Sequence, residues 1–179
     1  PDGAYSPAMR SFIAGVLARA GEICAFTNPV PGSYARFGSF EAPRYVAWSH
    51  QNRSQLIRIP AAPAPEYARI EVRMPDVSCN PYLAFALLLA AGFEGMERKM
   101  ELAEETPYDL YTANAGALEA LPASLEEAIA RAGGSAFVEK VLSADTARKY
   151  LALKQAEQNR WFAARDKEKY QDEAYFGVL

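Results

Sequence analysis

The segment Ala68-Arg-Ile-Glu-Val-Arg-Met-Pro75 alternates charged and apolar side chains with the period of two that is typical of a half-buried β-strand. Its apolar face carries Ile70, Val72 and Met74. Its charged face carries Arg69, Glu71 and Arg73. This charged face has two interpretations: an ordinary solvated surface, or, if it lies in a concavity, two guanidinium groups that bind an anion around one carboxylate suited to a metal ion.

Two further strand-like segments precede it, Arg44–Ser49 and Gln55–Pro60. The links between the three segments are short and polar or rich in Pro and Ala, which predicts an antiparallel meander. Before the strands, residues 28–41 concentrate Asn, Pro, Gly and Ser over a length typical of a binding loop or lid.

Cap signals predict helices on both sides of the strands. Ser6-Pro7 begins an amphipathic helix that we expect to end near Gly21. Asn80-Pro81 begins a second helix, apolar on nearly every side through Ala91 and therefore expected in the core. Three later serines are predicted N-caps, the last for a long helix through about Asp166: Ser124, Ser135 and Ser143.

The composition indicates a single globular domain: 179 residues, 50% hydrophobic, 23% charged, with a formal net charge of -3. The longest apolar run, Tyr82–Ala91, is about half the ~20 residues that cross a bilayer, so membrane insertion is disfavoured. No signal peptide opens the chain, and Cys24 and Cys79 have neither metal-type nor disulfide-type spacing, so we expect buried thiols and a cytoplasmic location.

Arginine is the only long cationic side chain before Lys99, and six arginines fall in one region: Arg36, Arg44, Arg53, Arg58, Arg69 and Arg73. A guanidinium binds carboxylate or phosphate through a planar fork of donors and stays charged when desolvated. The acidic net charge disfavours nucleic acid as the partner and leaves a small anionic ligand. The simpler interpretation is that these arginines pair with neighbouring acids on the surface.

An ordered series of motifs strongly resembles glutamine synthetase: Thr27-Asn-Pro, Gly32-Ser-Tyr-Ala-Arg36, Glu41-Ala-Pro43, Asn52-Arg-Ser54, Ile57-Arg-Ile-Pro60, Arg69-Ile-Glu-Val-Arg73 and Asn80-Pro-Tyr-Leu-Ala84. The resemblance covers residues 1–179 and corresponds to the C-terminal portion of the family's catalytic domain, with the N-terminal domain and the first half of the catalytic domain expected upstream. It implies an α+β fold in which antiparallel strands pack with several helices, here as a partial domain.

The resemblance implies a ligase that phosphorylates the side-chain carboxylate of L-glutamate with ATP and lets ammonia, bound as ammonium, displace the phosphate. It further implies Mg²⁺ or Mn²⁺, and a ring-shaped homo-oligomer whose active sites are shared between neighbouring subunits. Because several oxygen ligands are needed for such ions and most of the family's lie upstream, we expect the chain alone to be inactive.

The resemblance also implies roles for seven residues. Glu41 and Arg53 match catalytic residues, Glu41 as the flap carboxylate that helps to deprotonate ammonium. Substrate binding falls to Arg36, Glu41, Arg53 and Arg73, and nucleotide binding to Arg53, Arg58 and Arg69. Glu71 matches a metal ligand.

Some positions depart from the family pattern. Gly32 and Ala35 replace Asn and Lys, Glu66 stands where many members have a basic residue, and the spacing from Arg36 to Glu41 is one residue shorter than in the best-known bacterial members. These departures leave two alternatives: a γ-glutamyl-polyamine or other amine ligase, or a non-catalytic regulatory member of the family. His50 is interpreted as structural, and Tyr108 either as an ordinary loop residue or as a match to the tyrosine that some members adenylylate.

Overall fold

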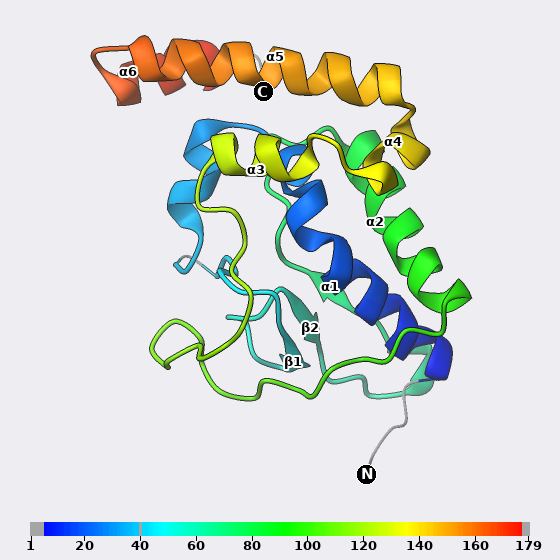
Figure 1. Cartoon of the computed structure of the whole chain (residues 1–179). Helices are drawn as coiled ribbons and strands as arrows, with labels where there is room; N and C mark the ends of the chain where they lie inside the picture. Colours follow the sequence, from blue (N-terminus) through cyan, green and yellow to red (C-terminus); the bar gives the residue numbers. More distant parts are fainter. Residues whose placement is uncertain (1–5, 40, 177–179) are drawn as a thin grey trace.

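The computed structural model describes residues 6–39 and 41–176 and confirms an α+β fold (Figure 1). The strands form one small sheet below helix α1, while α5 lies across the opposite end of the molecule over α3 and α4 (Figure 1). The elements before α2 are α1 (Pro7–Thr27), η1 (Pro31–Arg36), β1 (Trp48–His50), β2 (Ile57–Ile59), η2 (Pro65–Tyr67) and β3 (Glu71–Val72). The later elements are α2 (Pro81–Glu97), α3 (Leu125–Ala132), α4 (Ala136–Leu142), α5 (Ala144–Ala163), α6 (Lys167–Gln171) and η3 (Asp172–Phe176).

Helix α1 begins as predicted but ends later. The Ser6 hydroxyl accepts a hydrogen bond from the backbone N–H of Met9, and Pro7 occupies the first helical turn. The predicted end near Gly21 is wrong, because the helix continues to Thr27. Ile23 and Phe26 in the added turns are completely buried, and burial of two such side chains outweighs the roughly 1 kcal/mol that a glycine costs inside a helix.

The sheet has the order β1-β2-β3 and is mixed. The second pair is antiparallel as predicted, but β1 and β2 run parallel, so the antiparallel meander is wrong for the first pair. The reason lies in the link between them. The buried Gln55 side chain donates to the carbonyls of Thr106 and Tyr108, at 2.7 and 2.9 Å, so this link is bound to the loop at residues 106–108 instead of forming a hairpin turn.

The register of the antiparallel pair sets the two faces of the sheet. Ile57 lies opposite Val72, and Arg58 lies opposite Glu71. Ile57 and Met74 are completely buried, in agreement with the predicted apolar face. The charged side chains of β2 and β3 therefore project together from the other face.

Helix α2 is not the fully buried helix that its composition predicts. Its small residues face α1, and at Gly95 an added Cβ would lie 2.1 Å from the carbonyl oxygen of Ser11. The opposite side of the helix is exposed, including Tyr82, Phe85 and Leu89, with Phe85 at 63%. An apolar stripe of this kind is typical of a surface that is covered in a larger assembly.

The remaining sequence predictions concern caps and thiols. Ser124, Ser135 and Ser143 each accept a hydrogen bond from a backbone N–H in the first turn of the following helix, and α5 ends close to its predicted limit. Cys24 is a buried free thiol, whereas Cys79 is a half-buried free thiol. Within the described ranges, no helix is both long and apolar enough to cross a membrane.

Candidate functional site

Six charged side chains from four separate segments form one network of ion pairs, which we name the arginine cluster: Glu41, Arg53, Arg58, Arg69, Glu71 and Arg73. All six are predicted site residues. Their partners are distant in sequence rather than neighbours, with the exception of the pairs inside the β3 segment. The arginines of the cluster thus pair with its acids, and the side chains of Arg53 and Arg69 stay more than half exposed, at 59% and 55%.

Glu71 lies at the centre of three guanidinium groups. Its Oε2 is 2.7 Å from Nη1 of Arg58 and 3.6 Å from Nη1 of Arg73, and its Oε1 is 3.8 Å from Nη2 of Arg69. The sheet register explains the shortest contact, since Arg58 and Glu71 are direct cross-strand partners. The period of two places Arg69 and Arg73 on the same face as Glu71.

Glu41 forms the second acidic centre. Its carboxylate lies 2.8 Å from Nη1 of Arg53 and 3.4 Å from Nη2 of Arg73. The hydrogen bond from Arg53 lowers the pKa of Glu41, desolvation acts in the opposite sense, and the charges of Arg53 and Arg73 lower it further, so the carboxylate is ionised at neutral pH. Its backbone has φ 60, a left-handed conformation that is uncommon outside glycine and is found at functional loops.

Arg73 joins the two acidic centres. Besides its ion pairs with Glu41 and Glu71, its Nη2 donates to the backbone carbonyl of Glu41 at 2.9 Å, and its Nε donates to the carbonyl of Arg53 at 3.1 Å. Its side chain is only 15% exposed, against 59% for Arg53. Arg73 is thus held by the protein, while the guanidinium of Arg53 is open to a ligand.

Two contacts in the site come from residues that sequence reasoning missed. The backbone carbonyl of Gln51, a residue with φ 57, accepts from Nε of Arg58 at 3.1 Å. The hydroxyl of Tyr111 donates to the carbonyl of Arg53 at 3.1 Å. A backbone acceptor leaves no trace in the side-chain pattern, and Tyr111 lies too far along the chain for any local signal.

Arg36 lies apart from the arginine cluster. Its Nη2 donates to the backbone carbonyl of Met74, the residue after Arg73, and its guanidinium carbon lies 5.4 Å from the ring centre of Phe37. Its Nε is buried without a hydrogen-bond partner among the described residues, and burial lowers the pKa of the guanidinium. The structure therefore does not bring Arg36 into contact with the other predicted site residues, although it leaves one of its donors available.

The described residues do not by themselves fit a divalent cation. No group of three His, Cys, Asp or Glu side chains suited to a metal ion occurs within residues 6–39 and 41–176. Both oxygens of Glu71 face arginines, and His50 pairs with Glu105, with Nδ1 and Oε2 2.9 Å apart. A hard cation needs several oxygen ligands, so the metal role of Glu71 stays a prediction.

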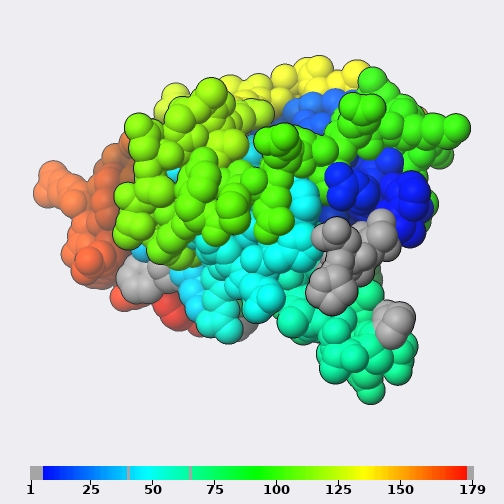
Figure 2. Space-filling model, turned by 90° about the horizontal axis from the view of Figure 1, so that it is seen from below, coloured from blue at the N-terminus to red at the C-terminus, as the bar shows by residue number. Residues whose placement is uncertain are grey.

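The guanidinium groups of the cluster outnumber its carboxylates four to two, so the site carries excess positive charge. Figure 2 shows the segment around residues 45–60 beside the loop around residues 104–120, and hydrogen bonds join the two where Gln55 meets Thr106 and Tyr108. Excess positive charge held by fixed side chains suits an anion with several oxygens, such as a phosphate.

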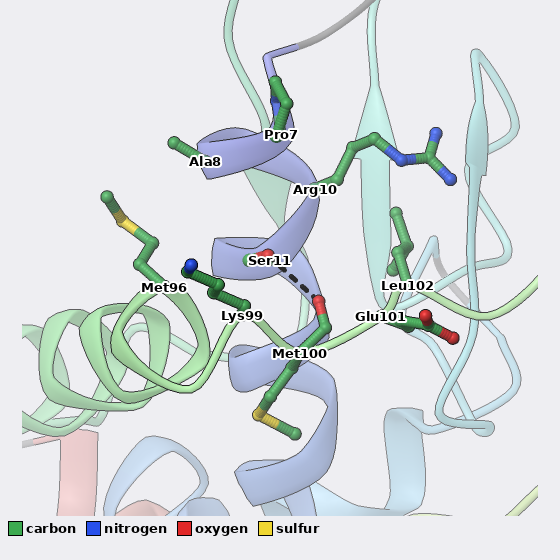
Figure 3. Close-up of a pocket in the computed structure, with 9 residues that line it drawn as sticks. All are labelled: Pro7, Ala8, Arg10, Ser11, Met96, Lys99, Met100, Glu101 and Leu102. Carbon is green, nitrogen blue, oxygen red and sulfur yellow. Dashed lines mark hydrogen bonds between the residues drawn. The ribbon is translucent and has the colours of Figure 1, made fainter.

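A hollow of about 720 Å³ lies elsewhere, between the start of α1 and the end of α2 (Figure 3). It is lined by Pro7, Ala8, Arg10, Ser11, Met96, Lys99, Met100, Glu101 and Leu102. No predicted site residue borders it, and the hydrogen bond from the Ser11 hydroxyl to the Met100 carbonyl, at 3.0 Å, joins α1 to the segment after α2 (Figure 3). The site is therefore identified by the chemistry of the cluster rather than by the depth of a cavity.

Comparison with known proteins gives consistent similarities. A family model described as the catalytic domain of glutamine synthetase matches residues 1–172. Glutamine synthetase of Methanosarcina mazei is 43% identical over 158 residues, which is 85% of this chain and 35% of that protein. Glutamine synthetase of Thermotoga maritima is 45% identical over 130 residues, 69% of this chain and 29% of that protein. The chain thus spans about a third of the length of the curated relatives it matches.

Two solved structures share the fold. The structure titled GmaS/ADP complex, conformation 1, has a TM-score of 0.80 at 25% identity and covers 99% of this chain and 42% of that chain. The structure titled apo GmaS without ligand has a TM-score of 0.77 at 26% identity, covering 96% and 39%. Neither similarity extends over more than half of the solved chain, so both concern part of a larger protein.

Proposed function

Because this chain belongs to the glutamine synthetase family, we propose that it is the C-terminal portion of a catalytic domain which, in the intact protein, joins ammonia to the γ-carboxylate of L-glutamate at the expense of ATP. An oxygen of the γ-carboxylate attacks the terminal phosphorus of ATP, and ADP leaves. Ammonia then attacks the carbonyl carbon of the γ-glutamyl phosphate, and inorganic phosphate leaves. The intact protein is further proposed to be a cytoplasmic, ring-shaped homo-oligomer.

The observation that carries this proposal is the arginine cluster. The reaction brings the phosphates of ATP and the carboxylates of glutamate into one cavity, where their negative charges repel each other. Phosphoryl transfer is catalysed mainly by positioning and by electrostatic stabilisation of the equatorial phosphate oxygens. Four guanidinium groups around two carboxylates, with Arg58 and Arg73 largely buried, would supply both.

The residues divide the work according to their contacts. The exposed Arg53, together with Arg58 and Arg69, would hold the phosphates of ATP. Arg73, which contacts both acidic centres, would lie at the carboxylate that reacts. The unpartnered Nε of Arg36 would receive a carboxylate oxygen of glutamate.

Glu41 would accept the proton that ammonium loses before ammonia attacks. An ionised carboxylate is required for this, and the hydrogen bond from Arg53 maintains it. When a ligand phosphate engages Arg53, the carboxylate is released from that ion pair and becomes a stronger base. Binding of the nucleotide and deprotonation of ammonium are thereby coupled through one arginine.

Mg²⁺ or Mn²⁺ is proposed as a cofactor of the intact protein, where it would neutralise phosphate charge. The described residues offer Glu71 and no complete set of ligands, so no step above depends on the ion. ATP itself is supported by the similarity to the solved GmaS structure whose title names ADP.

A second candidate is ligation of glutamate to an organic amine by the same phosphorylation chemistry. It is favoured by Gly32, which replaces the asparagine of the family motif. A Cβ at this position would lie 2.0 Å from Oε1 of Gln171, so a larger residue would require the side chain of Gln171 to move. The side chain of Gln171 thus lies against η1 at the position where the family pattern has asparagine.

The test measures ADP release by the intact protein with glutamate and ATP, using ammonium, methylamine and putrescine in turn. Ammonium is expected to be the preferred acceptor. Preference for an organic amine would instead support the second candidate, ligation of glutamate to an organic amine. Glu71→Gln removes one charge from the cluster and should lower kcat at least 100-fold. Glu119→Gln, which alters an exposed pair with Arg131 outside the cluster, should stay within threefold of the wild type. Absence of ADP release with every acceptor would contradict the proposed function.

A further inference from the structure

The backbone carbonyl of Arg53 accepts two hydrogen bonds. One comes from Nε of Arg73 and one from the hydroxyl of Tyr111, each at 3.1 Å. Tyr111 lies 58 residues after Arg53 and takes no part in the ion pairs of the cluster. The backbone of Arg53, the most exposed arginine of the cluster, is therefore fixed by two hydrogen bonds at its carbonyl.

Residues 106–110 of the loop that carries Tyr111 are hydrogen-bonded to Ser54 and Gln55, the two residues after Arg53. The backbone N–H of Leu110 donates to the hydroxyl of Ser54 at 2.8 Å, and the amide of Gln55 donates to the carbonyls of Thr106 and Tyr108. Ser54 and Gln55 are buried. Because these bonds do not involve the hydroxyl of Tyr111, the loop would keep its place without that single oxygen atom.

The hydroxyl of Tyr111 also lies in the electric field of the cluster. Desolvation raises the pKa of Tyr111, and the charge of Arg73 opposes this effect while that of Glu41 adds to it. The phenol is therefore neutral at physiological pH and acts as a hydrogen-bond donor. A neutral donor to the Arg53 carbonyl restricts the peptide from which the long guanidinium side chain extends.

We propose, on the basis of the proposed function above, that Tyr111 is a positioning residue which holds the main chain of Arg53 so that the guanidinium of Arg53 binds a phosphate of ATP next to the reacting carboxylate at Arg73. Arg53 has 59% of its side chain exposed, and among the described residues its guanidinium pairs with the side chain of Glu41 alone. When a ligand displaces Glu41, the direction of this side chain depends on its own backbone. The two hydrogen bonds at the carbonyl supply that direction.

The test is Tyr111→Phe in the intact protein, with Tyr108→Phe as the matched control. Tyr108 lies in the same loop, is 47% exposed, and its hydroxyl makes no hydrogen bond within the described part of the chain. Tyr111→Phe should lower kcat/KM for ATP about tenfold, the effect of roughly 1.4 kcal/mol, with a rise in KM and an unchanged melting temperature. Tyr108→Phe should stay within twofold of the wild type.

A double-mutant cycle separates positioning from general support of the fold. In an Arg53→Lys background, Tyr111→Phe should lower kcat/KM less than twofold, because the guanidinium that Tyr111 positions is gone. If Tyr111→Phe lowers kcat/KM equally in both backgrounds, Tyr111 only stabilises the loop and the inference is overturned. The same holds if the variant has a lower kcat and a lower melting temperature with unchanged KM. If the wild type is active and Tyr111→Phe has the same kcat/KM, the inference is also overturned. If the wild type neither forms nor binds ADP, the result contradicts the proposed function instead.

Discussion

Replacing Gly15 by alanine should destabilise the protein at the crossing of α1 and α2. A Cβ on Gly15 would lie 2.1 Å from the carbonyl oxygen of Ala91 and 2.8 Å from both Cα and N of Gly95. All three contacts are with backbone atoms, which no side-chain rotation can move. The two helices would have to separate by about 1 Å to restore ordinary contact distances.

The expected cost follows from two opposing effects. Overpacking costs about 1–3 kcal/mol, and we take about 3 kcal/mol because the obstacle is another helix backbone. Alanine regains about 1 kcal/mol through its helix propensity, which leaves a net loss of ~2 kcal/mol. For a cooperative unit of this size, 1 kcal/mol corresponds to about 2–4 °C, so the melting temperature should fall by about 4–8 °C.

Gly21→Ala is the control in the same helix. Its Cβ would lie 2.9 Å from Nη1 of Arg131, the end of a flexible side chain that can move aside. The helix gains about 1 kcal/mol, and loss of the exposed Arg131–Glu119 pair costs at most about the same. Thermal melting of both intact variants, followed by circular dichroism, gives the comparison. A Gly15→Ala variant as stable as Gly21→Ala would refute the close packing of these helices.

Two further predictions concern acid stability and the exposed face of α2. Arg19 lowers the pKa of Glu94 from 4.5 to about 2, so the pair contributes stability above pH 4.5 that is lost as the pH falls toward 2. The melting temperatures of the wild type and of Glu94→Gln should therefore differ at pH 7 and become equal near pH 2. A difference in melting temperature that does not change with pH would contradict this prediction. Phe85 is exposed, so Phe85→Ser should increase the soluble, monodisperse fraction of the isolated chain, measured by light scattering. Leu87 is fully buried in the same helix, so Leu87→Ser should prevent folding. Equal behaviour of the two variants would contradict the assigned faces of α2.

The structure also shows where sequence reasoning about the site succeeded and where it did not. The strand predicted over Ala68–Pro75 is reduced to Glu71–Val72, but its alternation correctly placed Arg69 and Arg73 on the same face as Glu71. The grouping of Arg36 with them is not reproduced, because its guanidinium turns toward the carbonyl of Met74. Side-chain direction in an irregular loop depends on acceptors that the local sequence does not contain.

Local chemistry therefore determined the helix starts at serine and asparagine caps, the faces of β3 and, through the ordered motifs, the family. Tertiary structure alone decided the parallel pairing of β1 with β2, the extension of α1 past Gly21, the meeting of Glu41 with Arg53 and Arg73, and the support that Tyr111 gives to Arg53. The physical reason is the distance along the chain between the partners. Caps and strand alternation involve neighbours within a few residues, whereas these pairings depend on burial and hydrogen bonds between segments that only folding brings together.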